Sequence, residues 1–225
     1  PRFTWARISI DAGNKESYTR IRSCAPGHWD VVWRNVGMAA QAIKRAKSDT
    51  ALGLGFVVTP HSYREIVEFA RIAKEHEVGN IRYTAMFSPS DESPFVPIYD
   101  GVRGLIDEAK TLATDSFAVY DNFGTRYEDL KQHRPDFDSC PHQYYVGYIG
   151  GNMKAFRCCL LAYSKRGEIA GGDLTNRRFD EFWESQERKD DLAALNPHGC
   201  ERCQFSGKIR GVLDAMKRPL HVEFP

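Results

Sequence analysis

The first half of the chain alternates short apolar clusters with segments of helical periodicity. The apolar clusters span residues 6–13, 51–60, 80–87 and 117–123, and their β-branched and aromatic residues predict four strands. After a short helical turn over 14–23, apolar residues recur at helical spacing over 28–47, 62–79 and 97–114. This alternation predicts right-handed βαβ units around a parallel sheet. Four such units do not close an eight-stranded barrel.

Local signals add detail to two of these elements. The apolar first strand, "ARISIDAG", is predicted to be buried on both faces, as strands of parallel sheets usually are. In the helix over 62–79, Ser62 is the predicted N-cap and Glu65 completes a capping box three residues later. Gly79 is predicted to close that helix.

The pattern changes near Asn122. A polar, proline-interrupted stretch follows, and then a predicted small antiparallel sheet over about 144–163. Next come a predicted helix over 177–195, with Phe179, Phe182 and Trp183 on its buried face, and a last helix over 205–217. We therefore predict two domains, an α/β domain over 1–122 and a small α+β domain over 123–225.

Composition narrows the range of partners. The chain has 225 residues, with 31 Lys and Arg against 30 Asp and Glu, a net charge of +1. This balance provides no broad positive field, so no nucleic acid and no membrane surface is expected as a partner. No apolar run approaches the roughly 18–20 residues of a membrane span. We expect a cytoplasmic protein acting on a small molecule.

Four of the six cysteines have a spacing that suits a metal centre. Cys140 and Cys158 stand alone, whereas Cys200 and Cys203 form a C-x2-C pair. Four thiolates satisfy either tetrahedral zinc or a four-iron cluster, and unligated core cysteines are the structural alternative. Structural zinc sites usually pair two short knuckles, so one knuckle facing two single cysteines favours an iron–sulfur cluster. Cys159 competes with its neighbour Cys158 as the second ligand.

The cysteine order single–single–C-x2-C resembles the "twitch" domain of radical S-adenosylmethionine (radical SAM) enzymes. That domain is a shortened SPASM-type auxiliary-cluster domain, and the nearest spacing is that of the dehydrogenases that oxidise 2-deoxy-scyllo-inosamine. The family has G-x4-C at its second cysteine, whereas six residues separate Gly151 from Cys158 here. "RISIDAG", "GLGFVVTP" and "NIRYTAMF" resemble the fourth, fifth and sixth strands of the family's barrel. Together these segments extend the resemblance over nearly the whole chain.

The resemblance implies a fold and an activity. The fold would be the C-terminal part of a partial (β/α)6 TIM-like barrel followed by a cluster-binding twitch domain. The complete enzyme would be an oxidoreductase that oxidises or otherwise modifies a small carbohydrate-like or other small-molecule substrate through a 5′-deoxyadenosyl radical. An auxiliary 4Fe-4S cluster would pass electrons, and a flavodoxin or ferredoxin would supply them.

The resemblance also implies roles for particular residues. The ligands of the auxiliary cluster would be Cys140, Cys158, Cys200 and Cys203. S-adenosylmethionine would lie against the ends of the first two strands, at Ser9, Asp11, Val57 and Thr59. Arg126, in "GTRYEDL", is a weak catalytic candidate because segments of this kind are familiar at the same junction in the family. The structural alternatives are strand-end and turn capping for these four positions and ion pairing for Arg126.

One family motif is missing from this sequence. Radical chemistry requires a C-x3-C-x2-C loop for a second 4Fe-4S cluster, and the only cysteine before Cys140 is Cys24. We therefore expect the N-terminal part of the barrel to precede Pro1 and the chain alone to be inactive. Two other functions remain open. One is a radical SAM enzyme that modifies peptides, and the other is a non-catalytic iron–sulfur or zinc module.

Overall fold

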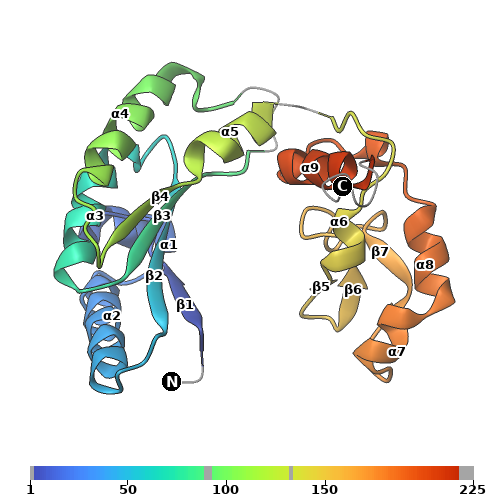
Figure 1. The fold of residues 1–225 in the computed structure, drawn as a ribbon, viewed down its shortest axis with the longest axis horizontal. Coiled ribbons are helices and arrows are strands. Elements are labelled where there is room, and N and C mark those ends of the chain that lie inside the picture. Colours follow the sequence, from blue (N-terminus) through green and yellow to red (C-terminus); the bar gives the residue numbers. More distant parts are fainter. Residues whose placement is uncertain (1–2, 89–92, 132–133, 218–225) are drawn as a thin grey trace, which may run out of the picture. The chain divides into compact units, whose positions relative to one another are not determined.

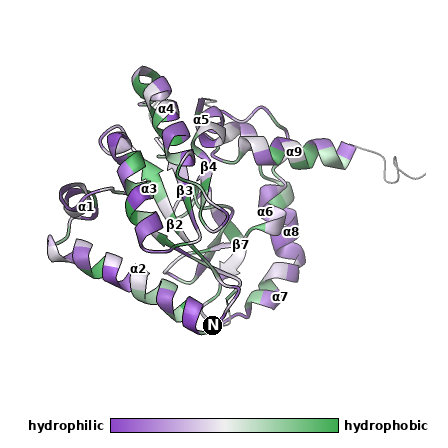
Figure 2. Ribbon diagram, turned by 60° about the vertical axis from the view of Figure 1, so that its left-hand side comes forward, coloured by the Kyte–Doolittle hydropathy of each residue, from purple (hydrophilic) through white to green (hydrophobic). Residues whose placement is uncertain are grey.

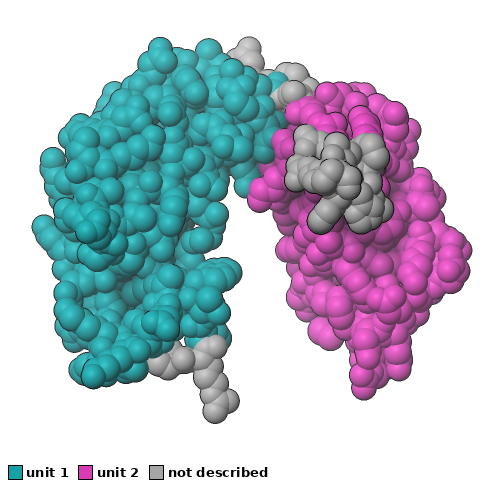
Figure 3. Space-filling view, viewed as in Figure 1, with its two compact units in different colours: residues 1–131 teal, residues 132–225 magenta. Residues whose placement is uncertain are grey.

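The computed structural model describes residues 3–88, 93–131 and 134–217. It divides into two compact units, residues 1–131 and 132–225 (Figure 3). The division follows Lys131, not Asn122 as predicted, because helix α5 (Phe123–Lys131) belongs to the first unit. Its residues Phe123, Tyr127 and Leu130 are buried in the core of that unit.

The first unit is an α/β structure with four strands in parallel (Figure 1). Its elements in chain order are β1 (Trp5–Ser9), α1 (Lys15–Arg22), α2 (Gly27–Arg45), β2 (Ala51–Val58), the 3-10 helix η1 (Tyr63–Glu65), α3 (Ile66–Glu75), β3 (Asn80–Ala85), the 3-10 helix η2 (Val96–Ile98), α4 (Tyr99–Lys110), β4 (Ala118–Asp121) and α5. The sheet order is β1-β2-β3-β4, and every neighbouring pair is parallel. The predicted strands and the parallel sheet are confirmed.

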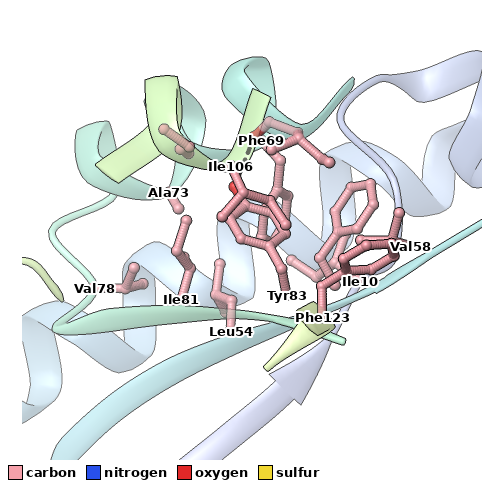
Figure 4. Close-up of a cluster of buried hydrophobic side chains, with 14 of the residues drawn as sticks. Ile10, Leu54, Val58, Phe69, Ala73, Val78, Ile81, Tyr83, Ile106 and Phe123 are labelled. Atoms are coloured by element: carbon pink, nitrogen blue, oxygen red, sulfur yellow. Dashed lines mark hydrogen bonds between the residues drawn. The ribbon is translucent and has the colours of Figure 1, made fainter. Parts of the chain in front are cut away.

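One face of this sheet holds the main core. Helices α2, α3 and α4 lie along that face (Figure 1), and α2 alternates hydrophilic and hydrophobic residues along its length (Figure 2). At the centre, the Phe56 ring lies 5.0 Å from Phe69 and 5.7 Å from Tyr83, measured between ring centroids. The Tyr83 hydroxyl donates to the Ile66 carbonyl at 2.6 Å, so the buried polar atom is satisfied (Figure 4). Burial raises the pKa of Tyr83.

The other face of the sheet carries polar side chains beside apolar ones and glycines, and we call it the open face. Strand side chains alternate between the two faces, and the strand register identifies the members of the open face. They are Trp5, Arg7, Ser9, Ala51, Gly53, Gly55, Val57, Asn80, Arg82, Thr84, Ala118 and Tyr120. The prediction that the first strand is buried on both faces is wrong, because β1 is the edge strand and Trp5, Arg7 and Ser9 are exposed.

The helix predicted over residues 62–79 also starts and ends differently in the structure. Residues 63–65 form the 3-10 helix η1, and the Ser62 hydroxyl contacts Thr59 instead of capping η1. The Glu65 carboxylate reaches the Gly13 N–H instead of completing a capping box. Glu77, with φ of 55°, makes the left-handed turn after α3 that was predicted for Gly79.

The second unit is a small α+β structure. Its elements are α6 (His142–Tyr145), β5 (Tyr148–Ile149), β6 (Lys154–Phe156), β7 (Glu168–Asp173), α7 (Phe179–Glu184), α8 (Gln186–Ala193), the 3-10 helix η3 (Pro197–Gly199) and α9 (Ser206–Lys217). The strands form an antiparallel sheet in the order β5-β6-β7. The predicted hairpin and last helix are confirmed, but the sheet extends to Asp173 and begins after a helix at residues 142–145.

The predicted helix over 177–195 is two helices. Ser185 takes an extended ψ of 145° and its side chain accepts from the Arg188 N–H, so it ends α7 and caps α8. Of the predicted buried residues, Phe182 is buried, Trp183 is partly buried, and Phe179 is 44% exposed. The buried core of this unit is small and consists of Ala155, Ile169, Leu174, Phe182 and Leu192.

A buried arginine connects the helices of the second unit. The Arg188 guanidinium lies 3.6 Å from the centroid of the Trp183 ring. It donates to the Trp183 carbonyl at 2.9 Å and to the Gln143 carbonyl at 3.1 Å. Arg188 therefore joins α8 to α7 and to α6, the helix that follows Cys140. Across the part of the chain that the structure describes, no helix has the length and apolar character needed to cross a membrane.

Candidate metal centre

The four predicted ligands all lie where an element of the second unit begins or ends. Cys140 lies two residues before α6, and Cys158 lies two residues after β6. Cys200 follows η3 directly, and Cys203 precedes α9. All four are half-buried. The hairpin of β5 and β6 thus carries the second cysteine to a loop of the same unit as the first.

The four sulfurs influence one another's ionisation. The pKa of Cys140 is raised to about 11, chiefly by burial and to a smaller extent by the charges of Cys203 and Cys158. Burial also raises the pKa of Cys158, and the charges of Cys159 and Cys203 add to the effect. Burial raises the pKa of Cys200, where Cys158 adds to the effect. These charge effects link Cys140 with Cys158 and Cys203, and Cys200 with Cys158.

A repeated hydrogen-bond pattern surrounds three of these sulfurs. The backbone N–H groups of Gln143 and His142 act on Cys140, and both lower its pKa. The N–H groups of Leu161 and Leu160 act in the same way on Cys158. The Phe205 N–H donates to the Cys203 sulfur at 3.4 Å. In each case a donor stands two residues after the cysteine, as in turns that hold a metal-bound thiolate, where hydrogen bonds to sulfur tune the site.

The neighbouring cysteines 158 and 159 differ in environment. Cys158 is half-buried and contributes to the pKa of both Cys140 and Cys200. Cys159 is exposed, and its sulfur accepts from the Gln204 side-chain amide at 3.1 Å. These surroundings favour Cys158 as the member of the four-sulfur group.

Arg166 holds the loop that carries Cys200. This role of Arg166 was not predicted from the sequence. Its guanidinium donates to the Asn196 carbonyl at 2.7 Å and to the Gly199 carbonyl. The positive charge of Arg166 also opposes the rise in the Cys200 pKa. No spacing rule marks an arginine so far from the cysteine in sequence.

Two histidines near the cysteines have structural contacts. His142 is buried and stacks on Phe205, with ring centroids 4.3 Å apart. His198 lies 2.9 Å from the Asp138 carboxylate and 3.2 Å from the Pro135 carbonyl. Both pairs join residues close to Cys140 to residues close to Cys200 or Cys203. The histidines therefore help to bring the cysteine loops together.

The strand-end candidates in the first unit form one connected group. Asp11 is buried, with φ of 66°, and its carboxylate accepts from the Val57 N–H at 2.8 Å. It also pairs with Arg22 at 2.5 Å. Burial raises the pKa of Asp11, and the hydrogen bond from Val57 and the charge of Arg22 oppose this effect. The structure thus brings Asp11 and Val57 together. The Asp11 carboxylate has a structural role, because it binds the Val57 N–H and Arg22.

The remaining candidates have less in common. Thr59 forms a turn in which its hydroxyl contacts the Ser62 hydroxyl at 2.9 Å and accepts from the Ser62 N–H at 3.1 Å. Ser9 is exposed at the end of β1, and its carbonyl accepts from Arg22. Arg126 is half-buried on α5, in the first unit.

Within residues 3–88, 93–131 and 134–217, no three or more His, Cys, Asp or Glu side chains are close enough together to hold a single metal ion. Comparison with protein-family models and with curated proteins finds no match to this chain. The described side chains therefore do not by themselves form a metal site, and a thiolate-bound centre is a proposal that rests on the cysteine spacing and on the backbone N–H groups near three of the sulfurs.

Proposed function

We propose that the second unit binds a 4Fe-4S cluster through Cys140, Cys158, Cys200 and Cys203. The observation that supports this most is the repeated turn in which an N–H two residues after the cysteine is directed at the sulfur. The electrostatic coupling among the thiols adds support, because the four thiolates would repel one another without a bound cation. When bound, such a cluster accepts and releases single electrons.

The residues of the unit would do three things for that cluster. The four thiolates hold it and leave no iron open for a substrate, which suits electron transfer. The backbone N–H groups stabilise negative charge on the sulfurs, and this makes reduction easier. Arg166 fixes the Cys200 loop through its two carbonyl contacts.

We also propose that the chain is the C-terminal portion of a radical SAM enzyme, with the first unit as part of a (β/α)6 TIM-like barrel. The parallel βα succession and the cysteine order support this, beside the sequence resemblance. In α/β folds ligands bind at the carboxyl ends of the strands. Ser9 and Val57 would contact S-adenosylmethionine there, Asp11 would position the Val57 backbone, and Thr59 would shape the adjoining turn.

In the complete enzyme a small molecule would be oxidised, with a flavodoxin or ferredoxin as electron donor. S-adenosylmethionine would be cleaved at a second 4Fe-4S cluster held by a C-x3-C-x2-C loop, which this sequence lacks. The 225-residue chain, loaded with its cluster and strongly reduced, is therefore expected to form no 5′-deoxyadenosine above a protein-free control. Turnover by this chain would contradict the role given to the four cysteines.

The decisive experiment is anaerobic reconstitution with iron and sulfide, followed by iron, sulfide and zinc analysis. We expect about four irons per chain and brown colour. Cys140→Ser, Cys200→Ser and Cys203→Ser should each lose the cluster, whereas the matched Cys24→Ser control in the first unit should retain it. Iron content unchanged in Cys140→Ser would contradict the assignment. One tightly held zinc and no iron would identify a zinc module instead.

The two adjacent cysteines provide an internal comparison. Cys158→Ser should lose the cluster, and Cys159→Ser should keep it, because Cys158 is half-buried and acts on the pKa of both Cys140 and Cys200, whereas Cys159 is exposed. The opposite result would exchange their roles and leave the cluster itself in place.

A further inference from the structure

The imidazole ring of His142 is buried and carries an unpartnered nitrogen. His142 is 7% exposed, and its Nδ1 atom has no hydrogen-bond partner among the residues that the structure describes. Buried polar atoms in proteins are normally hydrogen-bonded, and an unpaired one is costly to the fold. This one belongs to the first residue of α6, two positions after Cys140. Its location beside a candidate ligand indicates a functional reason for the unpaired atom.

The other unpartnered buried atoms of the second unit belong to side chains that are bonded elsewhere. The Gln143 side-chain amide donates to a backbone carbonyl at 3.0 Å. Arg188 donates to two backbone carbonyls. Asp191 pairs with Arg157 at 2.5 Å. The ring of His142 differs, because the contacts that the structure describes for it are with other rings.

These ring contacts fix His142 between the turns of two candidate ligands. The imidazole stacks on Phe205, with centroids 4.3 Å and planes 18° apart, and meets the Tyr145 ring edge to face at 5.4 Å. The Phe205 N–H donates to the Cys203 sulfur at 3.4 Å. The backbone N–H of His142 itself is a donor to the Cys140 sulfur. The ring is therefore held close to both turns.

Covalent geometry keeps the unpartnered nitrogen near Cys140. Four bonds separate Nδ1 of His142 from the backbone nitrogen of the same residue, so these two atoms lie within about 5 Å of each other. An imidazole nitrogen that carries a hydrogen is a donor, and a sulfur that carries negative charge is an acceptor. The sulfur chemistry of the candidate centre thus suits the atom that lacks a partner.

We propose that the His142 side chain donates an Nδ1–H hydrogen bond to a sulfur of the bound metal centre and makes its reduction easier. This inference rests on the cluster proposed for the second unit. Reduction adds negative charge to the sulfurs, and a buried donor stabilises the reduced form more than the oxidised form. Because stacking already fixes the ring, little conformational entropy is lost when the bond forms.

The first test is a redox titration of the reconstituted chain and of His142→Phe. Phenylalanine keeps a ring that can stack on Phe205 but has no nitrogen. We expect the equilibrium constant for one-electron reduction to fall at least about tenfold, the effect of one hydrogen bond to a charged group, which lowers the midpoint potential by about 59 mV. His28→Phe removes an exposed histidine of the first unit and should leave the potential unchanged.

Two further measurements separate a hydrogen bond from a packing effect. His142→Asn provides a side-chain N–H near the position of Nδ1 without an aromatic ring, so it should restore most of the potential lost in His142→Phe. The second measurement uses the parent chain grown with histidine whose imidazole nitrogens alone are isotopically labelled. Pulsed electron paramagnetic resonance of the reduced centre should detect a coupled imidazole nitrogen. This coupling should disappear in His142→Phe and persist in His28→Phe.

The outcomes distinguish this inference from the cluster assignment. Equal potentials of the parent and His142→Phe, or a reduced parent without a coupled imidazole nitrogen, would overturn the inference and leave the cluster in place. An equal fall in His142→Phe and His142→Asn would assign the effect to packing and overturn it too. If His142→Phe alone fails to load iron, the labelled parent chain decides. A parent chain that loads no iron would contradict the proposed function and this inference together.

Discussion

The Glu65 carboxylate accepts a hydrogen bond from the backbone N–H of Gly13 at 2.7 Å. Its other oxygen accepts from the Ser17 hydroxyl. Glu65 belongs to η1, ahead of α3, whereas Gly13 lies in the loop between β1 and α1. One side chain thus ties the first βα unit to the second. The approach is close, since a Cβ at Gly13 would lie 2.6 Å from the Glu65 carbonyl oxygen.

Removing this tie should destabilise the first unit. Glu65→Ala leaves the Gly13 N–H without its acceptor, and we expect a loss of about 1–3 kcal/mol in the free energy of opening, measured by hydrogen exchange of the β2 and β3 amides. Glu68→Ala is the matched control, because Glu68 is exposed and faces Arg71 at 3.5 Å, so its effect should stay below about 0.5 kcal/mol. Equal effects of the two variants would contradict a structural role for Glu65.

The buried Asp11 carboxyl should make stability depend on pH. Burial raises its pKa above the ordinary value of 3.8, so the folded chain holds that proton more tightly than the unfolded chain. This contribution to stability is present at low pH and is lost as the pH rises through the folded pKa. Asp11→Asn keeps an acceptor for the Val57 N–H and tolerates the left-handed backbone. Measured by urea unfolding, the variant should gain stability relative to the parent between about pH 3 and pH 7. A constant difference over this range would contradict the assignment.

Arg166 should control how firmly the cluster is held. Arg166→Gln shortens the side chain and removes charged donors from the Asn196 and Gly199 carbonyls. The ordered conformation of the Cys200 loop should thereby lose about 1.5–3 kcal/mol of stabilising free energy. We expect loss of iron to a chelator to become at least about tenfold faster. Arg178→Gln is the control, since Arg178 is exposed and pairs with Asp180. Equal rates in both variants would mean that the loop is held by other contacts.

The second unit should depend on its cluster for stability. Its five buried core residues provide little apolar burial, and a metal centre bound only by the folded form adds stability by linkage. Chelation should therefore reduce amide protection in residues 134–217, while β2 and β3 remain protected. Equal protection with and without metal would show that packing alone holds the unit.

The sequence predicted the sheet well because its strands are short, apolar and separated by helices of clear period. It failed where a local signal competed with helical propensity. Over 177–195 the helical pattern is continuous, yet Ser185 accepts from the Arg188 N–H and starts a second helix. The boundary between the units was predicted too early in the chain, because α5 is short and most of its exposed residues are polar. Its buried residues Phe123, Tyr127 and Leu130 nevertheless recur at helical spacing. That pattern could have been recognised.

Of the candidate site, only the four cysteines could be named from the sequence, and their role as ligands stays a prediction. The spacing of the cysteines is a property of the chain, whereas Arg166 joins the site through the fold. The open face could be predicted in part, because "RIS" and "NIRYT" alternate polar and apolar residues. Which face of the sheet the helices of the first unit cover depends on strand register and helix placement.

The donors directed at the three sulfurs belong to the main chain, and this sets how the site can vary in evolution. Side chains at positions 142, 160 and 205 can change without removing a main-chain N–H, so related chains can diverge widely around fixed cysteines. Proline is the exception, because it has no N–H to give. It is already present at Pro141, one residue after Cys140, where no donor is needed. One residue further along it would leave the sulfur without that partner.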